Sequence, residues 1–274
     1  MGLAGSLCAM RHVVRDTRAF HRLGMPLFWY FNFHYRGRWH DRHSTNEPDE
    51  TITLSYRNRT IRLPMTPVYS GALKGVFLDD EYALENVLPV PPRRILDLGA
   101  NIGMAAVALA AQFAKSEFLL VEPDPRNIRR LRRTIEWNAL QGVIATCAVG
   151  PKSERLMLRT GKNPTCSALQ TSKMHELPNT FEVAVRTIED ILAEFGWNGV
   201  DLVKIDIEGT EEALLTQNNS WLARTKALIL EIHPSCSVEA IANAISHYGF
   251  ELRRHGMGRE PVYIATRKEA RSLC

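Results

Sequence analysis

The sequence lacks the features of secreted, disulfide-bonded and membrane-spanning proteins. Its five cysteines are odd in number and scattered, without a C-x-x-C pair, so neither a disulfide framework nor a zinc site is expected. No apolar run approaches the ~20 residues of a membrane span, and the start, MGLAGSLCAM, has no basic leader of a secretion signal. These absences predict a cytoplasmic protein, and 274 residues suffice for one large domain with an extension.

Basic charge is concentrated at the N-terminus. Residues 1–43 contain seven arginines against two aspartates, a local charge of +5, whereas the whole chain carries +4. The same stretch holds five histidines and the aromatic cluster LFWYFNFHY at 27–35. Three interpretations are open: an arm whose aromatics pack on the main domain or on a second subunit, a peripheral contact with a membrane or glycolipid at the inner face of the membrane, and a grip for nucleic acid.

The segment between this arm and residue 94 indicates an accessory unit. After a polar link at 41–50, the stretch ITLSYRNRTIRL at 52–63 alternates apolar and polar residues around a turn, which predicts a β-hairpin. Residues 64–80 are expected to be irregular, and DDEYALENVL at 79–88 predicts a short helix stopped by prolines. The expected division is a basic aromatic arm over 1–50, an accessory hairpin and helix over 51–90, and a ligand-binding domain over 91–274.

The stretch RILDLGANIG, 94–103, predicts a buried strand that ends in a glycine-spaced turn, followed by a helix over 104–113. Glycines let backbone approach a bound group, and the free N–H groups at a helix start present partial positive charge to it. A second apolar strand, 118–121, ends at Glu122. An acid at this point of a βαβ unit usually holds the hydroxyls of a ribose.

The spacing of the glycines distinguishes between two nucleoside cofactors. A dinucleotide site needs G-x-G-x-x-G, whereas Gly99 and Gly103 are spaced G-x-x-x-G and Asp97 precedes them. A carboxylate beside the turn would repel a pyrophosphate but suits a ligand with an ammonium and a sulfonium, as in S-adenosylmethionine. The competing interpretation is that the two glycines only allow tight packing of strand and helix.

From residue 94 onward predicted strands and helices alternate, which is typical of a doubly wound, mostly parallel sheet. A helix opens at Pro123 to Pro125, and its arginines at 126, 129, 130, 132 and 133 are expected to face solvent. VIATCAV at 143–149 predicts a third strand, with Ala148 beside the nucleoside base. The segment 151–180 is expected to contain a mobile loop, which either carries substrate contacts or is only a surface excursion, and 182–196 is expected to form a strand and a helix.

A second group of polar residues lies in DLVKIDIEGTEEALL, 201–215. Lys204 and Asp206 share one face at the end of a predicted buried strand, where charge is costly without a partner. They could form a structural ion pair, or Asp206 and Glu208 could line the ligand crevice, as the strand-end rule for α/β sheets favours. The fifth strand, ALILEIH, brings Glu231 and His233 to the same edge.

The motifs LDLGANIG, VEPDPRN, AVG, VRTIED, DLVKIDIEGTEEALL and LILEIHP occur here in the order of the FkbM-type family of S-adenosylmethionine-dependent methyltransferases. The sequence resembles this family over about residues 75–265. The resemblance implies a Rossmann-like class I methyltransferase fold and O-methylation of sugars or glycans, polyketides or other small molecules. The family often has a serine pair in the loop after the third strand, whereas this chain has Cys166 beside Ser167.

The resemblance also implies site residues. Asp97, Gly99, Ala100, Asn101 and Gly103 would surround the methionine half of the cofactor. Glu122 with Pro123 would hold the ribose, and Ala148 would lie near adenine. Asp206 completes the predicted cofactor site.

The residues expected to carry the chemistry are His233, Asp206 and Glu208. An alcohol needs a base as the new bond forms, and an unperturbed histidine titrates near neutrality, so His233 is the expected base. Asp206 or Glu208 would orient it or replace it. No metal is part of the predicted site, although the two carboxylates could bind a divalent cation.

Two other functions stay open. The chain could be an RNA methyltransferase that grips its substrate through the arm, or a cofactor-binding protein of the same fold without activity. The motif N/D-P-P-Y/F of many amino-group methyltransferases is absent where IDIEG stands, which counts against the first. A small-molecule or glycan acceptor and a homo-oligomer are the expected partners.

Overall fold

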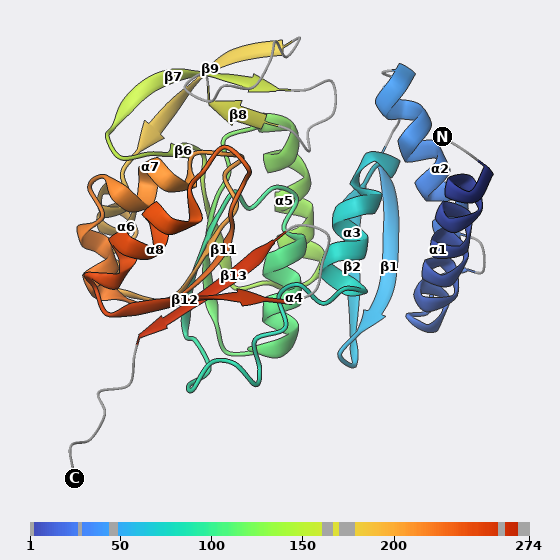
Figure 1. Cartoon of the computed structure of the whole chain (residues 1–274), viewed down its shortest axis with the longest axis horizontal. Coiled ribbons are helices and arrows are strands. Elements are labelled where there is room, and N and C mark those ends of the chain that lie inside the picture. Colours follow the sequence, from blue (N-terminus) through green and yellow to red (C-terminus); the bar gives the residue numbers. More distant parts are fainter. Residues whose placement is uncertain are drawn as a thin grey trace.

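The computed structural model describes residues 3–26, 29–43, 49–160, 167–169, 179–256 and 261–267. At its centre is a seven-stranded sheet in the order β12-β13-β11-β10-β3-β4-β5 (Figure 1). The strands are β3 (Arg94–Leu98), β4 (Glu117–Val121), β5 (Gly142–Ala145), β10 (Val200–Ile205), β11 (Thr225–Glu231), β12 (Phe250–His255) and β13 (Val262–Arg267). The first five strands are parallel to one another, and β13 pairs antiparallel with both of its neighbours, β11 and β12. This confirms the predicted Rossmann-like class I fold.

Helices cover both faces of this sheet. Helices α4 (Met104–Gln112) and α5 (Pro125–Trp137) lie on one face, where Leu109 and Leu131 are buried. Helices α6 (Ile188–Glu194), α7 (Glu211–Thr216) and α8 (Val238–Ser246), with the 3-10 turn η2 (Ser220–Arg224), lie on the other (Figure 1). The strands are therefore buried on both sides, so polar groups must be placed at their ends.

An accessory unit packs against α4 and α5. It comprises α1 (Leu3–Arg22), α2 (Trp29–His43), the hairpin β1 (Glu50–Tyr56) and β2 (Arg59–Met65), η1 (Pro67–Tyr69) and α3 (Ser70–Phe77). The predicted hairpin is confirmed, and both residues of its turn, Arg57 and Asn58, have positive φ, as a two-residue type I′ turn requires. The prediction that 64–80 is irregular is wrong, because the turn η1 and the helix α3 occupy it.

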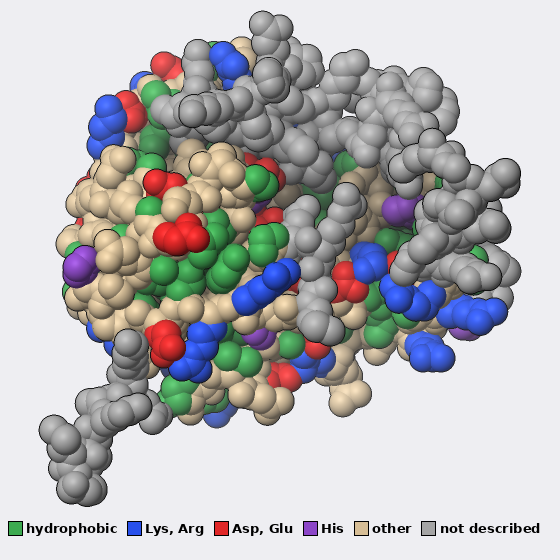
Figure 2. All heavy atoms as spheres, in the orientation of Figure 1, with side chains coloured by type: hydrophobic (Ala, Val, Ile, Leu, Met, Phe, Trp, Pro, Cys, Tyr) green, Lys and Arg blue, Asp and Glu red, His purple; other side chains and the backbone are tan. Residues whose placement is uncertain are grey.

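Aromatic side chains of the arm are buried within the chain itself. Phe20, Tyr30 and Phe33 are at most 2% exposed, and the Tyr30 hydroxyl donates to the Ser70 carbonyl (3.3 Å). Lys and Arg side chains gather over the N-terminal part of the surface (Figure 2). This arrangement agrees with the packed-arm interpretation for the described residues. Among the described helices, none combines the length and the apolar character that crossing a bilayer requires.

Three further expectations are corrected. The predicted helix at 79–88 is a series of turns, because Asp80 has φ 55° and Gln112 of α4 bonds the backbone of Tyr82 and Leu84 instead. The predicted third strand is divided into β5 and β6 (Ala148–Val149). Part of the expected loop is sheet, because β7 (Glu154–Thr160) and β8 (Ser167–Leu169) join β6 and β9 (Asn179–Arg186). Cys166 lies outside the described residues.

Candidate functional site

A cavity opens at the carboxyl ends of β3, β4 and β10 and encloses about 590 Å³, part of it open to solvent. Its lining includes six of the predicted cofactor residues: Gly99, Asn101, Glu122, Pro123, Ala148 and Asp206. Asp97, Ala100 and Gly103 are absent from the lining. Asn127, Glu208 and Thr210 complete its polar wall. The strand-end rule for α/β sheets therefore located the cavity correctly.

The glycine turn brings β3 and β10 unusually close. Gly99 has φ +74°, and a Cβ atom there would lie 1.8 Å from the carbonyl oxygen of Asp206. The N–H groups of Gly99 and Ala100 both donate to the Val121 carbonyl (3.0 Å each). Gly103 has a packing role, because its Cβ would lie 2.8 Å from the Leu131 side chain of α5. The two glycines thus differ: Gly99 shapes the cavity, and Gly103 seats α4 on α5.

Behind the turn, Lys204 joins two carboxylates. Its Nζ lies 3.0 Å from Asp97 Oδ1 and 3.6 Å from Asp206 Oδ2, and it donates to the Gly99 carbonyl (2.7 Å). Burial alone would lower the pKa of Lys204, but the charges of Asp97 and Asp206 outweigh it and raise that pKa. Burial raises the pKa of Asp97, and Lys204 opposes this shift. Asp97 is fully buried, so it supports the turn from behind, whereas the Asp206 side chain is 28% exposed.

Glu122 is held by donors from three directions. Its Oε2 accepts from the backbone N–H of Asn101 (2.8 Å), and its Oε1 accepts from the N–H of Asp124 (2.9 Å) and from Asn127 Nδ2 (3.3 Å). Burial raises the pKa of Glu122 to about 7, against the lowering effect of these donors. The carboxyl group is therefore fixed in orientation and close to titration at neutral pH.

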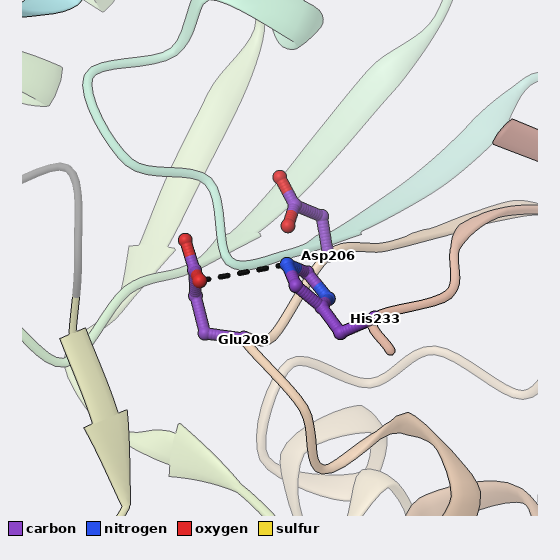
Figure 3. Close-up of side chains that lie close together, drawn as sticks. All are labelled: Asp206, Glu208 and His233. Carbon is purple, nitrogen blue, oxygen red and sulfur yellow. Dashed lines mark ion pairs between the residues drawn. The ribbon is translucent and has the colours of Figure 1, made fainter. Parts of the chain in front are cut away.

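His233 follows β11, and its ring lies beside Asp206 and Glu208 (Figure 3). Its Nδ1 lies 2.9 Å from Glu211 Oε1, and its Nε2 lies 3.5 Å from Glu208 Oε2 and 3.8 Å from Glu231 Oε1. Burial alone would lower the pKa of His233, but the hydrogen bond and charge of Glu211 and the charge of Glu208 raise it to about 9. The histidine is therefore perturbed, and its raised pKa favours the imidazolium at neutral pH.

The same edge contains groups that could hold a metal ion. Asp206, Glu208 and His233 each offer a ligand atom, and these atoms lie within 4.8 Å of one another. In the structure each of the three groups is already in an ion pair: His233 Nε2 with Glu208, His233 Nδ1 with Glu211, and Asp206 with Lys204. A metal would need the neutral imidazole and a closer approach of the carboxylates.

Sequence reasoning missed three residues of the site. Asn127 lies five residues after Glu122, in the first turn of α5, and that spacing could have indicated it. Glu211 is 0% exposed and accepts from the backbone N–H groups of Ile207 and Gly209. Tyr69 reaches the site from the accessory unit, and no local pattern marks it. One expected surface arginine, Arg130, is buried, because its Nε pairs with Asp49 Oδ1 (2.6 Å).

The match to known proteins covers the domain that carries this cavity. Residues 97–252 match the family described as the Methyltransferase FkbM domain. The 31-O-demethyl-FK506 methyltransferase FkbM of Streptomyces tacrolimicus is 24% identical over 225 residues, which are 70% of this chain and 84% of that protein. The AMB antimetabolite synthetase AmbE of Pseudomonas aeruginosa is 19% identical over 219 residues, which are 65% of this chain but only 10% of the synthetase.

A solved structure has the same fold. The crystal structure of the methyltransferase FkbM from Methylobacillus flagellatus aligns with a TM-score of 0.50 and 18% sequence identity. The alignment covers 69% of this chain and 47% of that chain, so this chain spans about half the length of that protein. Because the FkbM domain match covers more than half of the sequence and the fold agrees, the chain belongs to the FkbM family of methyltransferases.

Proposed function

We propose that the chain uses S-adenosylmethionine to methylate a hydroxyl group of a small molecule, such as a sugar or glycan, a polyketide or another natural product. The observation that carries the proposal is the convergence of Glu122, Asp206 and Glu208 on one cavity beside a glycine turn. The name of the relative from Streptomyces tacrolimicus, which refers to an O-demethylated acceptor, supports oxygen as the atom that is methylated.

The residues of the cavity fit this cofactor. Glu122 would accept hydrogen bonds from the ribose hydroxyls, and Ala148 leaves room for a flat base. Asn101 Oδ1 is buried without a hydrogen-bond partner, so it is an acceptor that a ligand would satisfy. Asp206 and the Gly99 backbone would hold the amino-acid half. Bound S-adenosylmethionine supplies an electrophilic methyl group on a sulfonium.

The chain's own contribution is alignment and a proton acceptor. Rigid walls that hold the acceptor oxygen in line with the methyl group supply up to ~7–11 kcal/mol in well-oriented systems. A base within hydrogen-bond reach of the hydroxyl adds about 10²–10⁴-fold. His233 is the proposed base, oriented through Nδ1 by Glu211 and joined to the cavity by Glu208. Because its pKa lies at about 9, this base is free in only a small fraction of molecules at neutral pH.

Calorimetric titration with S-adenosylmethionine and S-adenosylhomocysteine tests the cofactor. Micromolar binding by the wild type is expected, with weaker binding by Glu122→Gln and by Asp206→Asn, which change charge but little shape. Thr216→Val, on α7 away from the cavity lining, is the control and should bind normally. A folded wild-type chain that binds neither compound would refute the proposal.

Transfer of labelled methyl to a panel of hydroxylated acceptors tests the chemistry. With an active acceptor, turnover should rise with pH toward about 9, and His233→Asn should lose turnover while it keeps cofactor affinity. Undiminished turnover in this variant would show that His233 is not the base, and Glu208 would then be the remaining candidate for that role. Cofactor binding without transfer to any acceptor would favour the inactive binding protein. Turnover that is insensitive to a chelator would exclude a catalytic role for a divalent cation.

The division at residues 50 and 90 is proposed as well, with 1–50 as the arm, 51–90 as the accessory unit and 91–274 as the methyltransferase domain. Deletion of 1–43, followed by liposome sedimentation and size-exclusion chromatography, tests the arm. A change in lipid binding would support a peripheral membrane contact, and a change in oligomer size would support a subunit contact.

A further inference from the structure

We infer that Tyr69, a residue of the accessory unit, is a positioning residue for Glu122 and acts through the side-chain amide of Asn127. The inference rests on the proposed function, in which Glu122 holds the ribose of the cofactor. Tyr69 precedes the residues that match the FkbM domain, which begin at 97. A residue outside that domain would thus set the geometry of its cofactor acid.

Two hydrogen bonds connect the three side chains. The Tyr69 hydroxyl donates to Asn127 Oδ1 (2.8 Å), and Asn127 Nδ2 donates to Glu122 Oε1 (3.3 Å). Tyr69, Asn127 and Glu122 are 0%, 2% and 4% exposed, so water does not compete for these groups. Asn127 also lines the cavity, which places the chain of bonds at the ligand.

The direction of the first bond decides which end of the Asn127 amide faces Glu122. A hydroxyl that donates to Oδ1 leaves the NH₂ group directed at the carboxylate, where it is the donor that an acid needs. If the amide were reversed, Oδ1 would face the oxygens of Glu122 and two acceptors would meet in a buried site. Burial raises the pKa of Tyr69, so the phenol keeps its proton and remains a donor at neutral pH.

Contacts between the accessory unit and α5 hold Tyr69 in place. The residue ends the turn η1, directly before α3, and the guanidinium of Arg130 lies over its ring at 5.8 Å from the ring centre. Arg130 Nε is in turn fixed by Asp49 Oδ1 at 2.6 Å, and both side chains are mostly buried. Asp49 directly precedes the hairpin, so the accessory unit contacts α5 through Arg130, three residues after Asn127.

The charge on Glu122 depends on this arrangement. Burial raises its pKa to about 7, and the donors Asp124 N–H, Asn101 N–H and Asn127 Nδ2 oppose the rise. The other charged groups on this side are Asp124, which raises the pKa and is paired with Arg126, and Arg130 over the Tyr69 ring. Without the Asn127 donor, the pKa of Glu122 would rise further and the carboxylate would be scarcer at neutral pH.

The test is the pH dependence of S-adenosylhomocysteine binding, measured by calorimetry between pH 5.5 and 8.5. For the wild type, affinity should fall as the pH drops through about 7, and Glu122→Gln should flatten this profile. Tyr69→Phe should weaken binding by about threefold to tenfold at pH 7 and move the midpoint to higher pH. Tyr56→Phe is the matched control, because it removes a buried tyrosine hydroxyl of the same unit that bonds Asp80, away from the cavity lining.

A double-variant comparison separates positioning from general support. If Tyr69 acts through Asn127, Tyr69→Phe should have little further effect in an Asn127→Ala background. Equal losses in both backgrounds, or a Tyr69→Phe profile that matches Tyr56→Phe, would overturn the inference and leave the proposed function intact. A folded wild type that does not bind S-adenosylhomocysteine would instead overturn both. Circular dichroism checks the folding of each variant, and Tyr69→Phe keeps the test decisive if Asn127→Ala does not fold.

Discussion

Replacement of Lys204 by methionine should be among the most destabilising single changes in the central sheet. Lys204 is 3% exposed and is the cation that offsets Asp97, which is 0% exposed. It also donates to the backbone carbonyl of Gly99 at 2.7 Å. Methionine keeps most of the side-chain length but leaves the carboxylate of Asp97 buried without its ion pair.

The structure sets the size of the effect. Removal of one partner from a buried ion pair costs about 3–5 kcal/mol, because the other charge remains without compensation. Replacement of both partners is often close to neutral, so the double variant Asp97→Asn, Lys204→Met should recover much of the loss. An exposed pair provides the contrast: Lys226 is 76% exposed beside Asp201, and Lys226→Met should cost about 0–1 kcal/mol.

Urea unfolding at pH 7.5 and pH 5 measures these free energies. Without Lys204 the pKa of Asp97, already raised by burial, would rise further. Because an acid with a raised folded-state pKa loses stability as pH increases, the cost of Lys204→Met should be larger at pH 7.5 than at pH 5. A cost below about 1 kcal/mol, or a double variant no more stable than Lys204→Met, would refute the reasoning.

Two further predictions concern backbone contact and pH. Gly99→Ala should destabilise the chain more than Gly196→Ala does. Both residues have positive φ, but only a Cβ atom at position 99 would meet the Asp206 carbonyl. Equal losses of thermal stability in the two variants would contradict this prediction. Since the pKa of His233 is raised to about 9, its stabilising effect is complete below about pH 6.5 and is lost as the pH rises through 9. Stability in urea should therefore fall by about 2 kcal/mol between pH 7.5 and 9.5, and an equal fall in His233→Asn would contradict the assignment.

The parts of the fold that were predictable are those in which neighbours in sequence form the structure. The strand, glycine turn and helix over 94–113 are contiguous, and the helix consists of good helix formers. The hairpin was visible from its alternation and from Asn58 in the turn. In these segments local preference and tertiary structure agree.

Segments whose backbone is bound by distant residues were not predictable in this way. The 79–88 stretch has a helical composition, yet Gln112 of α4 accepts from the Leu84 N–H and donates to the Tyr82 carbonyl. These bonds fix the chain in a series of turns beside α4, so tertiary contacts override propensity. In 151–180, the strand β7 forms by pairing with β9, whose residues lie 19 to 31 positions further along the chain.

The residues of the candidate site also differ in whether they could be predicted from local sequence. Glu122, Asp206 and Glu208 line the cavity, and their place at the carboxyl ends of parallel strands could be predicted from the sequence. Asp97 was given a ligand contact, whereas its side chain is buried behind Lys204, a distinction that depends on which face of β3 it occupies. Asn127, Glu211 and Tyr69 act through pairings across elements, which the order of residues alone does not contain.

The charges at the strand ends support the proposal that the cavity takes S-adenosylmethionine and not a dinucleotide. Five carboxyl groups surround two cations there: Asp97, Asp206, Glu208, Glu211 and Glu231 against Lys204 and His233. Each cation has a fully buried acid at its back, Asp97 behind Lys204 and Glu211 behind His233. These two buried acids offset the cations, so Asp206 and Glu208 add negative charge to the lining of the cavity. In the proposed function, this negative charge would repel a pyrophosphate and attract the ammonium and the sulfonium of S-adenosylmethionine.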